Sequence, residues 1–174
     1  LRPTFEPTAF EKGLALSFHG AQRFAHTDGL LLERILRNLV SNAIRYSEDG
    51  GVLVACRPRG GKLIVQVWDS GIGIGEASLP HIFEEFYQVQ SKRPLEPHQR
   101  KGMGLGLAIV KRLADLLAAP LTVRSRPGHG SVFTLEASTV FGGVADGEAL
   151  TQHIHSKAHQ WRRFDAVVAC APGR

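Results

Sequence analysis

The segment from Leu30 to Ser47 constrains the fold most strongly, because it is long and contains neither glycine nor proline. Thr27 and Asp28 stand just before it and can supply a helix N-cap. Its apolar residues recur at helical spacing, which predicts a helix with one buried face that needs a second apolar layer. These residues are Leu32, Ile35, Leu36, Leu39, Val40 and Ala43.

Two predicted β-hairpins supply that second layer. In each hairpin, two runs rich in β-branched and apolar residues flank a cluster of proline and glycine. Between the hairpins lies a second segment with apolar residues at helical spacing, which Pro120 closes. Helices interleaved with antiparallel hairpins predict an α+β fold with helices on one face of a sheet. The predicted strands are residues 52–57, 62–69, 121–126 and 131–137, and the second predicted helix is residues 107–117.

The remaining segments are predicted to lie outside these elements. Residues 78–86 suggest a short helical piece, whereas residues 91–101 combine two prolines with four cations and predict a loop. Residues 148–164 show only a weak helical pattern. We therefore expect one domain over residues 1–138, followed by a tail or linker over residues 139–174.

Composition narrows the class of protein. A chain of 174 residues with 43% hydrophobic residues is long enough for one domain with a proper core. Its formal charge of +5 favours anionic ligands. This charge is spread along the chain and not gathered into a basic arm, and we expect no nucleic-acid partner. No apolar run approaches the roughly 20 residues of a membrane span, and no signal peptide is recognisable. Only two cysteines, Cys56 and Cys170, are present, so we expect a reducing, cytoplasmic compartment.

Four polar side chains share one stripe of the first predicted helix. Asn38 and Asn42 are four residues apart, and Arg45 and Tyr46 follow three and four residues later. A side-chain amide oxygen is a suitable ligand for Mg²⁺, and an arginine one turn further on is placed to meet a phosphate oxygen. The alternative is a pair of surface or capping asparagines.

An acidic residue followed by glycines ends one predicted strand. Asp69 leads into Gly71, Gly73 and Gly75. A carboxylate held at a strand end in apolar surroundings accepts hydrogen bonds, and the exocyclic amine of adenine is a natural donor. The glycines let the backbone approach a flat base or phosphates closely. The alternative is a plain turn.

A second glycine-rich segment, residues 101–107, stands at the start of the second predicted helix. Backbone amides that no side chain blocks, at the positive end of a helix dipole, form a phosphate cradle. The spacing of these glycines is not that of a P-loop. A dinucleotide-binding fold is disfavoured as well, because no strand–helix–strand repeat follows.

In this order and spacing, the motifs resemble those of the catalytic, ATP-binding domain of sensor histidine kinases. That family lies within the wider superfamily of type II topoisomerases, Hsp90 chaperones and mismatch-repair ATPases. The resemblance covers about residues 3–137. The matching segments are residues 38–47 (N box), 69–74 (G1 box), 83–87 (F box), 102–107 (G2 box) and 128–131 (the final glycine turn).

The resemblance implies a two-layer α/β sandwich of the Bergerat type, with a mixed, mostly antiparallel sheet of about five strands. It implies that Asn42 binds Mg²⁺, that Asn38 lies beside the triphosphate of ATP, and that Asp69 binds the adenine amine. Phe83 and Phe86 would anchor a lid and also pack in the core. The implied nucleotide site consists of Asn38, Asn42, Arg45, Tyr46, Asp69, Gly71, Gly73, Ile74, Phe83, Arg100, Lys101, Gly102, Gly104, Leu105, Gly106, Leu107 and Thr134.

The resemblance also implies roles within this set. Asn38 and Arg45 would act at the phosphates as catalytic residues, Tyr46 would pack on the nucleoside, and residues 91–101 would form the lid. Hydrolysing relatives carry a glutamate where Asn38 stands, and an amide cannot accept a proton as a general base. Phosphoryl transfer to a positioned nucleophile is therefore favoured over hydrolysis of ATP.

The phosphoacceptor histidine of the family is not recognisable in this chain. None of His19, His26, His81 and His98 has the acid and the proline that follow the acceptor in the family. The implied partners are therefore a dimerisation domain that carries the acceptor histidine, and a downstream response regulator. The isolated domain is expected to be a cytoplasmic monomer, whether or not the full-length protein is anchored in a membrane.

Several alternatives stay open at this point. A nucleotide-sensing or degenerate kinase module would bind ATP without transferring a phosphoryl group, and an ATPase would turn ATP over without any acceptor. Serine-kinase anti-sigma factors share the asparagine helix but usually lack this F box. The tail contains a candidate metal site, for which the spacing of the residues is only a weak indication. It consists of His153, His155, His159 and Cys170.

Overall fold

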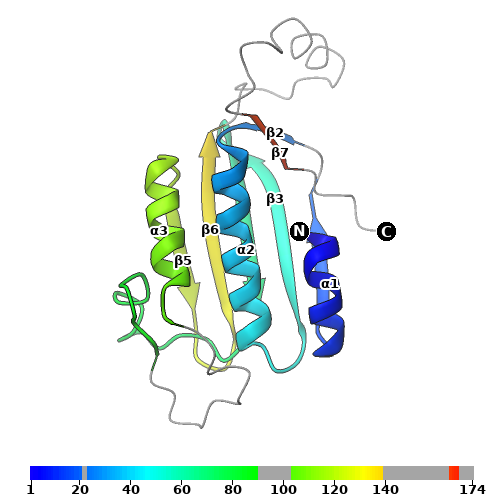
Figure 1. Ribbon diagram of the computed structural model, residues 1–174, viewed down its shortest axis with the longest axis vertical. Coiled ribbons are helices and arrows are strands. Elements are labelled where there is room, and N and C mark those ends of the chain that lie inside the picture. Colours follow the sequence, from blue (N-terminus) through cyan, green and yellow to red (C-terminus); the bar gives the residue numbers. More distant parts are fainter. Residues whose placement is uncertain (21–22, 90–102, 139–164, 169–174) are drawn as a thin grey trace, which may run out of the picture.

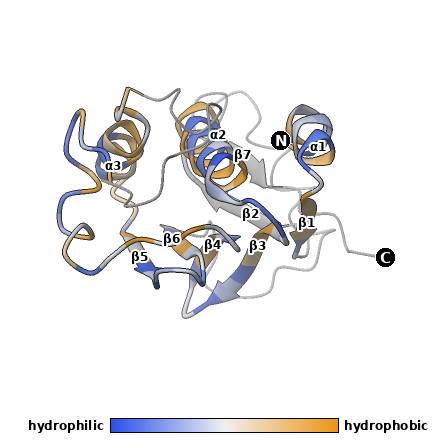
Figure 2. Ribbon diagram, turned by 90° about the horizontal axis from the view of Figure 1, so that it is seen from below, coloured by the Kyte–Doolittle hydropathy of each residue, from blue (hydrophilic) through white to orange (hydrophobic). Residues whose placement is uncertain are grey.

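The computed structural model describes residues 1–20, 23–89, 103–138 and 165–168. Its main body is a two-layer sandwich in which helices cover one face of a five-stranded sheet (Figures 1 and 2). The helices are α1 (Arg2–Glu11), α2 (Gly29–Tyr46) and α3 (Gly106–Leu116). The strands lie in the spatial order β1 (Ala15–His19), β3 (Gly51–Arg59), β4 (Lys62–Asp69), β6 (Ser131–Ser138) and β5 (Leu121–Ser125).

The sheet is mixed but mostly antiparallel. Strand β1 pairs with β3 in parallel, and all other neighbours in this sheet are antiparallel. Strands β3 and β4 form the first predicted hairpin, and β5 and β6 form the second. A separate antiparallel pair consists of β2 (Arg23–His26) and β7 (Asp165–Val168). The predicted α+β class and the mostly antiparallel five-stranded sheet are confirmed.

The long helix α2 lies over the middle of the sheet and organises the core. It begins at Asp28, whose carboxylate accepts hydrogen bonds from the backbone amides of Leu30 and Leu31 at 2.9 and 3.1 Å. Its apolar stripe faces strands β3 and β4, as Figure 2 shows. Full burial of one such aliphatic side chain stabilises a fold by about 1.5–3 kcal/mol. The largest fully buried aliphatic side chains are Ile35, Val40, Val52, Leu63, Val65, Val67, Val110 and Leu135.

A lysine from the end of α1 caps the other end of α2. The ammonium of Lys12 donates hydrogen bonds to the carbonyl oxygens of Ile44, Arg45 and Ser47 at 2.8, 2.9 and 2.8 Å. A helix end leaves such carbonyls without intrahelical partners, and a cation there complements the helix dipole. Desolvation lowers the pKa of Lys12 below its ordinary value, and nearby Glu48 opposes that shift. The cap therefore joins α1 to the last turn of α2.

Some local predictions were wrong. Residues 78–86 form a succession of turns, not a short helix, because Pro80 lacks an N–H and disfavours a helical residue before it. Phe83 packs against the core as predicted. Phe86 does not, because its backbone is left-handed (φ 63°) and its side chain is 67% exposed.

Other elements were not predicted at all. Helix α1 and strands β1, β2 and β7 had no counterpart in the sequence analysis. The weak helical pattern of residues 148–164 and the histidines of the tail lie outside the described residues. Within the described ranges, no helix is long and apolar enough to cross a membrane.

Removal of the lysine cap tests how far α2 depends on it. We expect Lys12→Met to lower the free energy of unfolding by about 1–3 kcal/mol, because three carbonyls lose a charged donor. Urea unfolding followed by circular dichroism measures this loss. Lys62→Met is the matched control, because the ion pair of Lys62 with Glu136 is partly exposed and contributes at most about 1 kcal/mol. Equal effects of the two substitutions would contradict the capping role.

Candidate nucleotide-binding site

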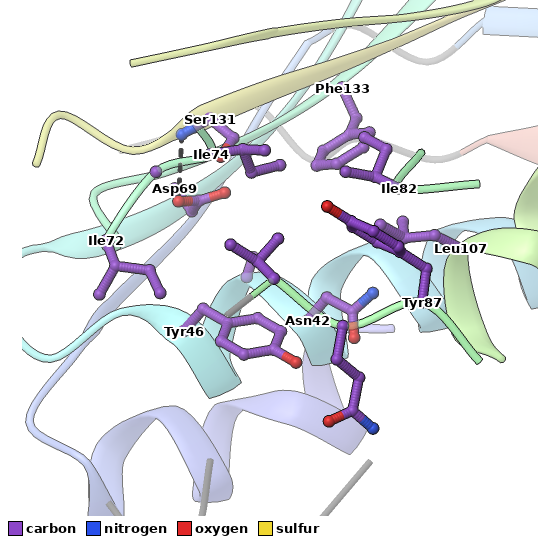
Figure 3. Close-up of a pocket in the computed structure, with 14 residues that line it drawn as sticks. Asn42, Tyr46, Asp69, Ile72, Ile74, Ile82, Tyr87, Leu107, Ser131 and Phe133 are labelled. Carbon is purple, nitrogen blue, oxygen red and sulfur yellow. Dashed lines mark hydrogen bonds between the residues drawn. The ribbon is translucent and has the colours of Figure 1, made fainter. Parts of the chain in front are cut away.

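A pocket lies between the C-terminal half of α2, the start of α3 and the end of β4 (Figure 3). Asn42 and Tyr46 approach it from the helix layer, and Asp69 faces them from the sheet layer. Its wall is mostly apolar, with a few polar groups, which is typical of small-molecule sites. The lining residues are Asn42, Ala43, Tyr46, Asp69, Ile72, Gly73, Ile74, Ile82, Tyr87, Gln88, Val89, Leu107, Ser131 and Phe133.

Asp69 is the acidic group of this pocket. Its Oδ1 accepts hydrogen bonds from the backbone amides of Gly71 and Ser131 at 2.9 and 3.1 Å. Desolvation raises the pKa of Asp69 above its ordinary value, and hydrogen bonds from the Gly71 backbone and from the Ser131 backbone and hydroxyl oppose that shift. The carboxylate is therefore fixed in place and partly shielded from water, which suits it to accept a hydrogen bond from a flat, uncharged ligand.

Two glycines allow the chain to close around this carboxylate. Gly73 (φ 68°) lies against the backbone of Arg126, and Gly130 (φ 82°) lies against the backbone of Asp69. A Cβ atom at either position would overlap backbone atoms, in addition to the strain of a left-handed residue. The backbone amide of Gly128 also donates to the carbonyl of Ile72 at 2.8 Å. The loop after β4 is thus packed tightly on the β5–β6 turn.

The polar stripe of α2 faces the start of α3. A Cβ atom on Gly106 would lie 3.3 Å from Asn38 Oδ1 and 3.6 Å from Asn42 Nδ2, so both amides lie close to that helix N-terminus. The side chain of Asn38 donates to the carbonyl of Arg34 at 2.9 Å. Among the described residues, no side chain caps α3, whose N-cap residue is Leu105. Its first backbone amides are therefore available to an anionic group beside the two asparagines.

The structure brings part of the predicted site together. Six predicted residues line the pocket: Asn42, Tyr46, Asp69, Gly73, Ile74 and Leu107. The predicted residues that do not line it, but lie in segments next to it, are Asn38, Arg45, Gly71, Phe83, Gly104, Leu105 and Gly106. Arg100, Lys101 and Gly102, together with the predicted lid over residues 91–101, lie outside the described residues.

Thr134 was placed in the site wrongly. Its neighbour Phe133 lines the pocket, and successive residues of a strand point to opposite faces of the sheet. Thr134 accordingly lies on the face away from the helices, where its hydroxyl accepts a hydrogen bond from Gln66 at 3.0 Å. Strand β6 presents Ser131 and Phe133 to the pocket instead.

Sequence reasoning missed several lining residues. Tyr87 was noted only as part of the F box, yet its ring faces the cavity across from Tyr46 (Figure 3). The alternation of strand β6 was the signal available for Ser131 and Phe133. The other lining residues that were missed are Ala43, Ile72, Ile82, Gln88 and Val89.

Most of the chain is similar to known proteins. Residues 27–139 match the family model described as "Histidine kinase-, DNA gyrase B-, and HSP90-like ATPase". The aerobic respiration control sensor protein ArcB of Escherichia coli K12 is 40% identical over 131 residues, which are 73% of this chain and 17% of that protein. The sensor histidine kinase YkoH of Bacillus subtilis is 33% identical over 136 residues, which are 78% of this chain and 29% of that protein. The chain thus spans less than a third of these relatives.

Solved structures show the same likeness. Full-length ShkA in complex with AMPPNP superposes with a TM-score of 0.62 at 30% identity, over 79% of this chain and 28% of that chain. The catalytic domain of the histidine kinase ThkA superposes with a TM-score of 0.63 at 25% identity, over 79% of this chain and 87% of that chain.

The raised pKa of Asp69 predicts a specific pH dependence of stability. A carboxyl group whose pKa is raised by folding stabilises the fold below its unfolded pKa, and this contribution is lost as the pH rises through the folded pKa. We therefore expect Asp69→Asn to gain stability relative to the unmodified chain as the pH rises from about 4 to 7. Urea unfolding at several pH values measures the difference, with Asp49→Asn, at an exposed position, as control. A difference that does not change with pH would refute the assignment.

Proposed function

The chain belongs to the family of histidine kinase-, DNA gyrase B- and HSP90-like ATPases, as an ATP-binding catalytic domain of the sensor histidine kinase type. From this premise we propose that it binds Mg-ATP and transfers the γ-phosphoryl group to a histidine of a dimerisation domain outside this chain. The observation on which the proposal mainly rests is the fixed carboxylate of Asp69 in an otherwise mostly apolar pocket.

Adenine suits the sheet side of the pocket. Its 6-amino group is a hydrogen-bond donor, and the Asp69 carboxylate is an acceptor held in one orientation by Gly71 and Ser131. Aromatic and aliphatic side chains can contact the faces of the base, with Tyr46 and Tyr87 on opposite walls. A purine that carries a keto group at position 6 would meet the carboxylate acceptor to acceptor and would be disfavoured.

The triphosphate and Mg²⁺ suit the helix side. Asn42 offers an amide oxygen, a hard ligand of the kind that Mg²⁺ accepts, and Asn38 lies one turn away along α2. The uncapped N-terminus of α3 adds backbone amides for phosphate oxygens. Bound Mg²⁺ would neutralise charge on the phosphates. Arg45, the lid residues Arg100 and Lys101, and Gly102 of the glycine-rich segment are proposed as further phosphate contacts on the resemblance alone.

Phosphoryl transfer is proposed in preference to hydrolysis of ATP because of the residue at position 38, Asn38. In transfer, a nitrogen of the acceptor imidazole bonds to the γ-phosphorus while the bond from that phosphorus to the oxygen of ADP breaks. Positioning and charge neutralisation suffice for this step. Hydrolysis needs a general base for water, and the amide of Asn38 cannot accept a proton. The second candidate function is an ATP-sensing module that binds nucleotide without transfer.

The wider context of the domain is proposed from its multidomain relatives. ArcB and the sensor protein TorS of Escherichia coli are named as sensors and are far longer than this chain. We infer that the phosphoryl group passes from the dimerisation domain to a response regulator. We also infer that the domain acts in the cytoplasm, as a monomer when it is isolated.

Phosphotransfer in trans tests the proposal. With γ-labelled ATP and the purified dimerisation domain, we expect label on the acceptor histidine, and little release of phosphate when that domain is omitted. Asp69→Asn should reduce labelling at least about tenfold at limiting ATP, because the adenine amine loses a charged acceptor. Asp115→Asn changes an exposed carboxylate on α3 and should leave labelling unchanged. ATP binding without any label would favour the sensing module instead.

A further inference from the structure

Three oxygen-bearing side chains stand in a row across three neighbouring strands. The register pairs Asp69 of β4 with Ser131 of β6, and Ser131 with Ser125 of β5. Directly opposed residues of an antiparallel pair share one face of the sheet. Asp69 and Ser131 line the pocket, whereas Ser125 is the outer member of the row and does not. Nothing in the proposed function gives Ser125 a role.

The hydroxyl of Ser125 joins three separate segments. Its Oγ accepts a hydrogen bond from the backbone amide of Ile74 at 2.8 Å and lies within donating distance, 2.9 Å, of the carbonyl oxygen of Gly130. It also lies 2.9 Å from the Oγ of Ser131. Ser125 therefore holds the loop after β4, the β5–β6 turn and the hydroxyl of Ser131 together.

The hydroxyl protons of this row can be counted. Each serine hydroxyl has one proton and two lone pairs, and the Ile74 amide occupies one lone pair of Ser125. The single proton of Ser125 can go either to the Gly130 carbonyl, which also accepts from the Arg126 amide at 3.2 Å, or to the oxygen of Ser131. In the second arrangement, the proton of Ser131 is left to point at Asp69. A hydrogen bond from that hydroxyl lowers the pKa of Asp69. Without the Ser125 hydroxyl, the Ser131 hydroxyl loses its partner on the far side and the Ile74 amide loses its acceptor.

We propose that Ser125 is a positioning residue of the nucleotide site, whose hydroxyl orients Ser131 and the loop at Ile74 so that Asp69 presents its carboxylate to the 6-amino group of adenine. This inference rests on the proposed binding of ATP at Asp69. Ser125 acts through its neighbours and does not itself contact the nucleotide. It therefore affects the recognition of the amino group more than the binding of the rest of the ligand.

Two ligands separate this role from general damage to the pocket. We compare the Kd of ATP with the Kd of purine riboside triphosphate, which lacks the 6-amino group, by titration calorimetry. For Ser125→Ala we expect about threefold to tenfold weaker ATP binding and less than about twofold change for the analogue. Thr122→Val is the matched control, because Thr122 lies on the same strand in an exposed position and also loses a hydroxyl. It should leave both constants unchanged.

The outcomes are distinct. Ser125→Thr keeps a hydroxyl and should restore the preference for ATP, whereas equal weakening of both ligands by Ser125→Ala would overturn the inference. Should Ser125→Ala fail to fold, Ser131→Ala interrupts the same row of side chains and should also reduce the preference for ATP over the analogue. An unchanged preference in Ser131→Ala would overturn the inference as well. If the unmodified chain binds neither ligand, the proposed function itself fails, and the inference fails with it. If both the unmodified chain and the Thr122→Val variant bind ATP, the proposed function is supported independently of the role of Ser125.

Discussion

The partly buried carboxylate of Asp69 ties the site to the fold. A desolvated carboxylate is costly unless hydrogen bonds compensate for the lost water. Here the compensating amides belong to Gly71 and Ser131, which come from two segments far apart in the chain. For both amides to reach one oxygen, the loop after β4 and the β5–β6 turn must close on each other. The left-handed glycines Gly73 and Gly130 allow that approach.

The second constraint is the double role of helix α2. One face supplies much of the core, and the adjoining stripe presents Asn38 and Asn42 toward the start of α3. Ligand groups placed on a packed helix are held more accurately than groups on a loop. The Asp28 cap at one end and the Lys12 cap at the other fix the helix. The polar groups of the site are therefore positioned by the same contacts that stabilise the domain.

The layers of the fold could be predicted from the sequence, because strong periodicity marks α2, α3 and the two hairpins. Helix α1 could not, since it contains Pro7 and has only weak amphipathic character. The placement of Thr134 was wrong because a shift of one residue along a strand reverses the face, and sequence alone does not give the register. The place of the Tyr87 side chain in the pocket depends on the left-handed backbone of the preceding residue, Phe86. Residue propensities do not predict that backbone conformation. Ser125 shows a role only once the register has placed it beside Ser131.

In the proposed mode of binding, Asp69 and Asn42 hold the two ends of one Mg-ATP molecule. The most direct test of this mode is calorimetric titration of the chain with a non-hydrolysable ATP analogue, with and without Mg²⁺, beside a folded Asn42→Ala variant. We expect tighter binding of the analogue in the presence of Mg²⁺ and loss of that gain in the variant. Binding that is indifferent to Mg²⁺, or the same gain in Asn42→Ala, would contradict this mode of binding.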